Sequence, residues 1–143
     1  MIQNILERKG RDLFTVSPSE NLKSAAGKMV EHGVAALVIL DDRGVGGLIS
    51  EREIIQMIAL HGERALTMPV SQVMQKNPPA VEPTDSLRRA MQLMTRNRAR
   101  HLAVVEGAEV VGVVSIGDVV KSRLEDLETE ANVLRDVYIA AAH

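Results

Sequence analysis

Residues 112–118 read GVVSIGD, and residues 47–53 read GLISERE. Each stretch runs from a glycine through an aliphatic pair to a serine, and each ends on an acid three residues later. The same offset (112 − 47 = 65) aligns the chain with itself from residue 15 to residue 55 without a gap. The aligned residues include Val16 and Val81, Pro18 and Pro83, Leu22 and Leu87, and Ser50 and Ser115. The chain therefore reads as two copies of one unit.

Each copy predicts the order strand, helix, strand, strand, helix. An extended piece ends at a proline, apolar residues then recur at helical spacing, and two apolar runs flank a polar turn. We expect strands at residues 14–17, 36–40 and 45–49 of the first copy and at 80–82, 101–105 and 110–114 of the second. Ser19 or Thr84 is expected to cap the first helix of its copy, with Glu20 or Asp85 in the first turn.

The predicted fold class is α+β: two β-α-β-β-α repeats packed sheet to sheet with pseudo-two-fold symmetry, followed by a long C-terminal helix. A small sheet of this size is not stable alone, so the two sheets must cover each other. We assign residues 1–65 to the first repeat, 66–125 to the second, and 126–143 to an extension of the last helix. The connection carries a short helical piece at 70–76.

The last helix is expected to run from about residue 116 to about 141. Its apolar residues are spaced 4-3-4-3-4, which is the spacing of a coiled-coil seam. Two interpretations stay open: the seam packs on its own domain, or its distal half meets a second subunit. We expect a homodimer. The seam residues are Val120, Leu124, Leu127, Ala131, Leu134 and Tyr138.

Composition excludes several classes of protein. Among 143 residues, 45% are hydrophobic and 25% charged, which is typical of a globular domain. The formal net charge is −2, and there are one Phe, one Tyr and no Trp. Neither a basic surface nor an aromatic platform is available, so we expect no nucleic-acid partner. With no cysteine, no signal peptide and no long apolar run, we expect a cytoplasmic protein without a membrane partner.

Catalytic and metal motifs are not expected. Ser50 and Ser115 recur with the repeat and have no base within a triad pattern, which favours binding over catalysis. The spacing of His32, His61 and His143 does not fit a metal site. We therefore expect neither an enzyme nor a bound metal.

The two quoted stretches resemble the Gly-h-x-Ser/Thr-x-x-Asp signature of CBS domains, the cystathionine-beta-synthase-type repeats. Residues 112–118 fit it, and Glu53 stands where the family usually has Asp. The segments 14–18, 80–83 and 98–105 also look like the family. The resemblance covers about residues 1–125 and implies a free-standing tandem pair with two clefts.

In the family such clefts bind adenosine derivatives, and the pair usually dimerises and regulates another protein. The resemblance therefore implies a regulatory adenine-nucleotide sensor acting on an unidentified partner. AMP is the first choice of ligand, with ATP, ADP or NAD(H) as further choices, and no metal is required. The alternative is a structural or dimerisation module whose clefts are vestigial, an interpretation that Glu53 supports for one cleft.

By the same resemblance, each cleft combines strands of one repeat with the motif of the other. One would place Thr15, Ala36 and Leu37 around adenine, with Val113, Ser115 and Asp118. The other would use Val81, Leu102 and Ala103, with Ile49, Ser50 and Glu53.

The chemistry of the motif supports this assignment. A carboxylate near a helix start can accept two hydrogen bonds from a ribose diol. Ser115 and the helix-start amides suit phosphate oxygens, and Gly112 would let a ligand approach the backbone. The simpler interpretation of Asp118 is an acid that complements the helix dipole.

A basic cluster precedes the strand at residues 101–105. Arg98, Arg100 and His101 are the candidate phosphate ligands, while Arg96 is better explained as a cation at a helix end.

Overall fold

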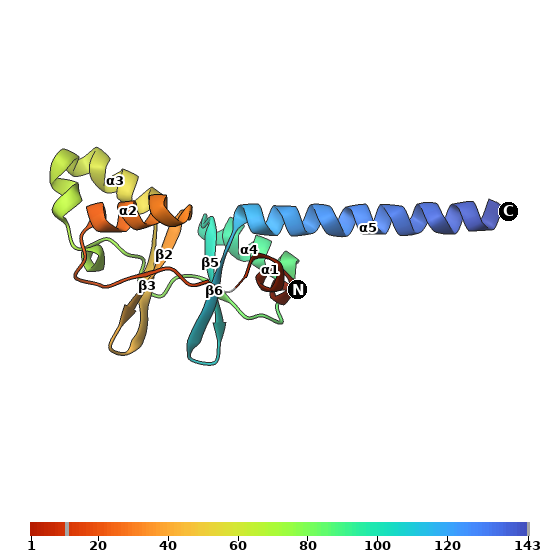
Figure 1. The fold of residues 1–143 in the computed structure, drawn as a ribbon, viewed down its shortest axis with the longest axis horizontal. Coiled ribbons are helices and arrows are strands. Elements are labelled where there is room, and N and C mark those ends of the chain that lie inside the picture. Colours follow the sequence, from red (N-terminus) through yellow and green to blue (C-terminus); the bar gives the residue numbers. More distant parts are fainter. Residues whose placement is uncertain (11, 143) are drawn as a thin grey trace.

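The computed structural model describes residues 1–10 and 12–142. Two similar α+β units lie side by side, and one long helix, α5 (Ile116–Ala142), projects from the second unit (Figure 1). The described residues form two three-stranded sheets, which confirms the predicted fold class.

The first unit contains a sheet in the order β1-β2-β3. β1 (Thr15–Val16) pairs in parallel with β2 (Ala36–Asp41), and β2 pairs antiparallel with β3 (Gly44–Ser50). The helices are α2 (Leu22–His32), between the first two strands, and α3 (Glu51–His61), after the hairpin.

The second unit repeats this arrangement in the order β4-β5-β6. Its strands are β4 (Ala80–Val81), β5 (His101–Glu106) and β6 (Glu109–Ser115), and α4 (Leu87–Asn97) joins the first two. The pairing register shifts after Ile39 in one hairpin and after Val104 in the other, which are matching positions of the repeat.

The first helix of each unit begins later than the sequence predicted. The caps are Asn21 and Ser86, whose side chains accept hydrogen bonds from the amides three residues on, at 2.9 and 3.0 Å. The acid just before each cap closes the preceding turn, where its carboxylate accepts the amide of residue 17 or 82 at 2.7 or 2.8 Å. The predicted roles were therefore wrong for Ser19, Thr84, Glu20 and Asp85.

A helix that the sequence analysis did not foresee, α1 (Ile2–Lys9), packs on the second unit. Its buried residues Ile2, Ile5 and Leu6 join the cluster built on β4, α4, β5 and β6. Two backbone hydrogen bonds of 2.9 Å, from the amides of residues 2 and 3 to the carbonyls of residues 85 and 83, fix its start. The segment that precedes the first unit thus completes the core of the second.

The connection between the units packs on the first unit, although it leads into the second. It forms two short 3-10 helices, η1 (Gly62–Thr67) and η2 (Val70–Gln72), so the helical piece expected at 70–76 is shorter than predicted. Ala65 and Val70 are fully buried in the core of the first unit. We call α1 and residues 62–75 the lead-in segments, because each precedes one unit in sequence and packs on the other. The predicted boundaries 1–65 and 66–125 follow sequence order and do not capture this exchange.

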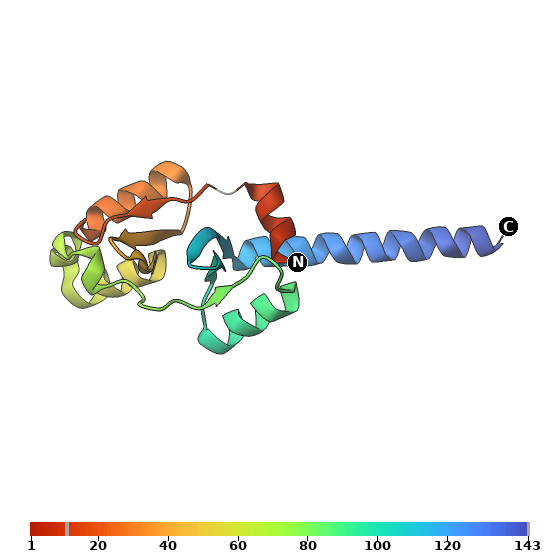
Figure 2. The ribbon, with the colours of Figure 1, turned by 90° about the horizontal axis from the view of Figure 1, so that it is seen from below.

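The two sheets meet at a third apolar cluster. Ala36, Val38 and Leu48 are buried there, and Val110 and Val113 of the second unit pack against them. Figure 2 shows the two units seen from below, with the strands in the middle and the helices outside.

Gly47 and Gly112 occupy matching positions on β3 and β6, and a lead-in segment approaches each of them. A Cβ at Gly47 would lie 2.4 Å from the carbonyl oxygen of Gln75, and one at Gly112 would lie 2.7 Å from Cδ2 of Leu6. The expectation that Gly112 admits a ligand is therefore wrong, because Leu6 fills the space.

We predict that Gly47→Ala destabilises the protein by about 1–3 kcal/mol, because a backbone carbonyl cannot move aside. Gly112→Ala should cost less, since the end of a leucine side chain can shift. Gly27→Ala is the control: nothing lies within 4 Å of a Cβ there, and the residue is inside α2, so stability should rise by about 0.5 kcal/mol. Urea unfolding of the three variants tests the order, and a larger loss at Gly112 than at Gly47 would contradict it.

Candidate functional site

Two clefts lie at the junction of the units. The first, which we call the Asp118 cleft, is a cavity of about 420 Å³. The second, the arginine cleft, consists of two adjoining cavities of about 380 and 350 Å³ that share Arg52, Gln75 and Arg98. Their sizes fall within the range of small-molecule sites, roughly 300–1,000 Å³. The clefts adjoin at Ala35 and His101, which line both.

The repeat relates the walls of the two clefts. Gly33 and Val34 line the Asp118 cleft, and their copies Arg98 and Ala99 line the arginine cleft. Both Gly33 and Arg98 end a helix in the left-handed conformation, with φ of 63° and 51°. An arginine in place of the glycine puts a cation at the corresponding corner of the second cleft.

Asp118 and Ser115 form a capping box at the start of α5. The Ser115 amide donates to Oδ2 of Asp118 at 2.8 Å, and the Asp118 amide donates to the Ser115 hydroxyl at 3.1 Å. The carboxylate therefore has the helix-start role of the simpler interpretation, and it also lines the cleft.

Lys9 from the end of α1 binds the same carboxylate. Its Nζ donates to Oδ2 of Asp118 at 2.7 Å and to the carbonyl of Val113 at 3.0 Å. Partial burial disfavours the ionised acid, but the bonds from Lys9 and from the Ser115 amide outweigh it. The pKa of Asp118 therefore lies below its ordinary value of 3.8.

Glu53, the copy of Asp118, has both carboxylate oxygens engaged. The Ser50 hydroxyl donates to Oε2, and Nε2 of Gln75 donates to Oε1 at 2.6 Å. Gln75 comes from the second lead-in segment, as Lys9 comes from the first. Glu53 is only 8% exposed, so little of its carboxylate is open to a ribose while these partners stay bound.

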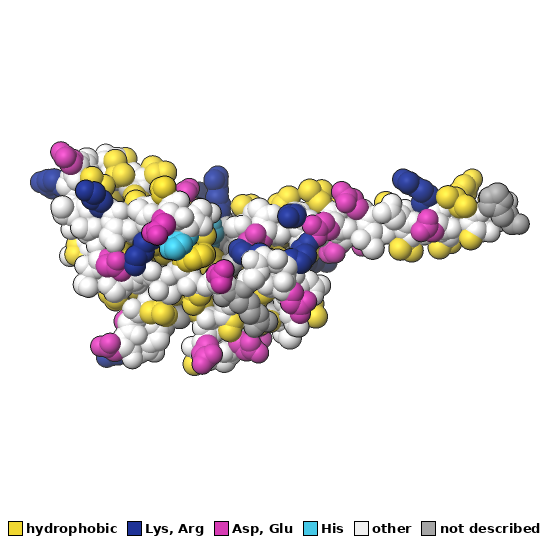
Figure 3. Space-filling view, viewed as in Figure 1, with side chains coloured by type: hydrophobic (Ala, Val, Ile, Leu, Met, Phe, Trp, Pro, Cys, Tyr) yellow, Lys and Arg dark blue, Asp and Glu magenta, His cyan; other side chains and the backbone are white. Residues whose placement is uncertain are grey.

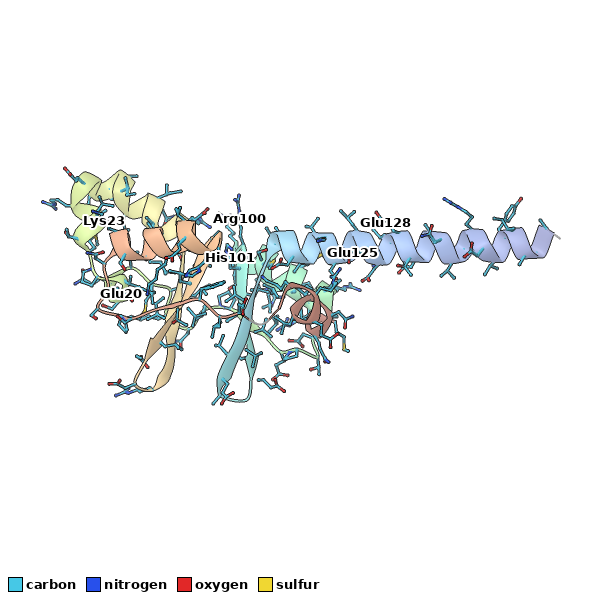
Figure 4. The ribbon with its side chains drawn as sticks, viewed as in Figure 1. Glu20, Lys23, Arg100, His101, Glu125 and Glu128 are labelled. Atoms are coloured by element: carbon cyan, nitrogen blue, oxygen red, sulfur yellow. The ribbon has the colours of Figure 1, made fainter. Side chains whose placement is uncertain are left out.

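Arg98 and Arg100 are exposed residues of the arginine cleft, as the sequence suggested for phosphate ligands. Arg52 joins them, and its guanidinium donates to the carbonyl of Arg98 at 3.0 Å. Arg100 and His101 lie at the start of β5, where the two units meet (Figure 4). Glu51 and Glu53 also line this cleft, so its cations are partly balanced.

His101 differs from the arginines in charge. Burial lowers its pKa below the ordinary value of 6.5 and outweighs the opposing effect of Glu51 and Glu53. The lowered pKa favours the neutral imidazole at pH 7, and in that form the ring can donate one hydrogen bond and accept another.

The structure brings some of the predicted site residues together and leaves others in the cores. Ala36, Val113, Ser115 and Asp118 line the Asp118 cleft, and Ser50, Glu53, Arg98, Arg100 and His101 line the arginine cleft. Thr15 pairs with β2 and lines neither cleft, whereas its neighbour Phe14 does. The remaining side chains are fully or almost fully buried, and these are Leu37, Ile49, Val81, Leu102 and Ala103.

Several cleft residues were not among the predicted site residues, and those that the contacts above single out are Lys9, Phe14, Arg52 and Gln75. Extending the offset upstream of residue 15 would have matched Gly10 with Gln75 and drawn attention to the lead-in segments. The sequence analysis also proposed helix-start amides as phosphate donors, but one such amide at each helix start is already hydrogen-bonded within the protein. The amide of Ile116 already donates to the carbonyl of Arg100 at 2.8 Å, and that of Glu51 donates to Ala35 at 3.0 Å.

No group of three or more His, Asp or Glu side chains within residues 1–10 and 12–142 is placed to hold a metal ion. In the same part of the chain, no helix combines the length and the apolar character needed to cross a membrane.

Comparison with known proteins places these features in context. The family model described as CBS domain matches residues 8–60 and 70–125. The CBS domain-containing protein YhcV of Bacillus subtilis (strain 168) is 30% identical over 123 residues, which are 86% of each chain. The crystal structure of the CBS-domain protein ATU1752 from Agrobacterium tumefaciens superposes with a TM-score of 0.81 at 38% identity, over 85% of this chain and 97% of that one. PAE2072 from Pyrobaculum aerophilum, a CBS domain protein complexed with AMP, gives 0.72 at 25% identity, over 82% and 88%.

We predict that Lys9 and Asp118 are energetically coupled. Their side chains are 41% and 24% exposed, so a double-mutant cycle with Lys9→Met and Asp118→Asn should give about 0.5–1 kcal/mol at pH 7. Because the pKa of Asp118 is lowered on folding, this stabilisation is complete above pH 3.8 and is lost as the pH falls through the folded value. Urea unfolding of the four proteins at about pH 7 and at a series of lower pH values measures the coupling, and a coupling energy of zero at about pH 7 would contradict the pairing.

Proposed function

This chain belongs to the CBS domain family, and on that basis we propose that it is a regulatory module that binds an adenine nucleotide and signals occupancy to a partner protein. AMP is the ligand that we propose first. ATP, ADP and NAD(H) share its adenosine and phosphate groups and are the further candidates. The AMP complex of PAE2072 supports this class of ligand.

The observation that carries the proposal is the position of Asp118. Its carboxylate is fixed by the capping box on the wall of a cavity whose other walls include Phe14, Val34, Ala36 and Val113. Apolar side chains suit the faces of an adenine ring, and an ionised carboxylate makes strong hydrogen bonds to hydroxyl donors. This arrangement fits a nucleoside with its ribose diol on Asp118.

The phosphate would lie toward the arginine cleft, which adjoins the Asp118 cleft at Ala35 and His101. Arg98 and Arg100 keep their positive charge at neutral pH and present planar guanidinium donors that match phosphate oxygens. A nucleotide whose adenosine lies in one cleft could therefore direct its phosphates to the other.

Lys9 gives the proposal a mechanism for signalling. A ribose diol on Oδ2 of Asp118 competes with the 2.7 Å contact of Lys9. Arg8, the neighbour of Lys9 in α1, forms an ion pair with Glu125 of α5. A ligand that releases Lys9 would therefore shift the equilibrium between two arrangements of α1 against α5, provided that it binds one arrangement more tightly.

The alternative, a structural module with vestigial clefts, gains support from one observation, the full engagement of Glu53 by Ser50 and Gln75. Isothermal titration with AMP, ATP and NADH distinguishes the two proposals. Absence of binding of all three to the purified protein, checked to be free of co-purified nucleotide, would favour the structural module.

We predict that the two acids contribute unequally to binding. Asp118→Ala should weaken AMP binding by roughly ten- to a hundredfold, because a hydrogen bond to a charged group contributes about 1.5–3 kcal/mol. Glu53→Ala should have little effect on the tighter site. Calorimetry with both variants, and with Asp126→Ala, an exposed residue of α5 that lines neither cleft, as a control, measures this. Equal losses for Asp118→Ala and Glu53→Ala would show that the sites are equivalent.

We also predict that phosphate recognition depends on the arginine cleft. Arg98→Ala and Arg100→Ala should each reduce the preference for AMP over adenosine by about fivefold or more, whereas Arg96→Ala, which lines neither cleft, should not. Raising the salt concentration should weaken AMP binding more than adenosine binding. If adenosine binds as tightly as AMP to the unmodified protein, these arginines are not phosphate ligands.

A further inference from the structure

The coiled-coil seam of α5 faces solvent and not the rest of the chain. α5 packs on α4 and α1 through a face that includes the buried residues Val119 and Ser122. The seam residues Val120, Leu124, Leu127, Leu134 and Tyr138 are 49, 56, 43, 70 and 76% exposed. At about 100° per residue, the packed face and the seam lie on opposite sides of the helix. The interpretation in which the seam packs on its own domain is therefore wrong.

The seam is continuous from the body of the protein into the projecting part of α5. It begins at Val120, beside the packed turns, and ends at Tyr138, about 27 Å further along the helix. Apolar side chains are visible along the projecting part in Figure 3. A period of 3.5 residues is the pattern by which a helix pairs with another helix over several turns.

Charged residues flank the seam at the e and g positions, which influence whether two helices pair in parallel or antiparallel. With Leu124 and Ala131 at the a positions, Arg123 and Glu130 are g residues, and Glu128 and Arg135 are e residues. Arg123 and Glu130 lie on the same side of α5, with 3.9 Å between their charged groups. In a parallel pair each g residue faces the e residue five positions later in the other helix. That rule opposes Arg123 to Glu128 and Glu130 to Arg135.

We propose that α5 pairs in parallel and in register with α5 of a second copy of this chain, through the seam from Val120 to Tyr138. This alignment covers all six seam residues and opposes unlike charges at four places in the symmetric pair. The two copies of the body formed by the two units then lie at the same end of the paired helices. The proposal does not depend on nucleotide binding.

Antiparallel pairing fits these residues less well. An antiparallel pair that covers the same seam matches residue 120 with 138 and 127 with 131, and it places Glu128 beside its own copy and Glu130 beside its own copy. An antiparallel pair shifted by one heptad opposes unlike charges, but it leaves two seam residues outside the contact between the helices: Leu134 and Tyr138 for one direction of the shift, Val120 and Leu124 for the other. Like charges at these positions are unfavourable, so the charge pattern favours the parallel pair.

Sedimentation equilibrium of the full chain tests the pairing. We expect a dimer at tens of micromolar and a dissociation constant raised by about tenfold or more in Leu134→Lys. Val133→Lys is the matched control, because Val133 is an equally apolar neighbour, 55% exposed, that lies outside the seam. A monomeric unmodified protein, or equal effects of the two lysine substitutions, would overturn the proposal. Both side chains are exposed, and circular dichroism verifies that the variants stay folded.

Disulfide trapping tests the direction. The chain has no cysteine, so a single introduced one reports without interference. In the parallel pair the two copies of residue 134 face each other, whereas full antiparallel overlap separates them by about 15 Å along the axis. We expect Leu134→Cys to form disulfide-linked dimers and Thr129→Cys, on the outer face, to form far fewer. A cross-link in a mixture of Val120→Cys and Tyr138→Cys chains, with none from Leu134→Cys, would overturn the parallel direction.

Charge reversal tests the flanking pairs. Arg135→Glu places like charges beside Glu130 of the second copy and should raise the dissociation constant about threefold or more. The double variant Glu130→Arg with Arg135→Glu restores unlike charges and should return the constant toward that of the unmodified protein. A double variant that is weaker than the single one would contradict the g-to-e pairing.

Discussion

The exchange of lead-in segments is the interaction on which the rest of this structure depends. Each unit has an apolar face that its own residues leave incomplete, and the segment before the other unit fills it. The packing of the lead-in segments requires glycine at positions 47 and 112, because a side chain at either position would collide with the incoming segment. Since neither unit has a complete core without the other's lead-in segment, the two units fold as one body with clefts between them.

The same exchange makes the two clefts chemically different. The first lead-in segment brings Lys9 to Asp118, and the second brings Gln75 to Glu53. A lysine paired with a partly exposed carboxylate leaves a polar contact that a hydroxyl-bearing ligand can replace. An amide and a serine hydroxyl that occupy both oxygens of a buried glutamate leave a closed internal network. The two copies of the motif therefore differ: Asp118 is partly exposed and has a replaceable partner, whereas Glu53 is buried and bonded through both oxygens.

Parts of the site were predictable because the repeat aligns them. Ser115, Asp118, Ser50 and Glu53 follow from the offset, and all four line the clefts. The apolar residues assigned around adenine were less accurate. Leu37 and Leu102 lie on the strand faces that pack against the helices of their own units. Successive side chains of a strand point to opposite faces, and the sequence pattern does not say which face meets the helices and which meets a cleft.

The sequence alone determined the repeat, the order of strands and helices within each repeat, the length of α5 and its seam, because each of these depends on spacing along the chain. Only the tertiary structure decided where the lead-in segments pack, which acid keeps a replaceable partner, that burial lowers the pKa of His101 and that the seam faces outward. These properties depend on contacts between residues as far apart as Lys9 and Asp118, and on the burial of each group in the folded chain. Both the contacts and the burial exist only once the two units have packed together.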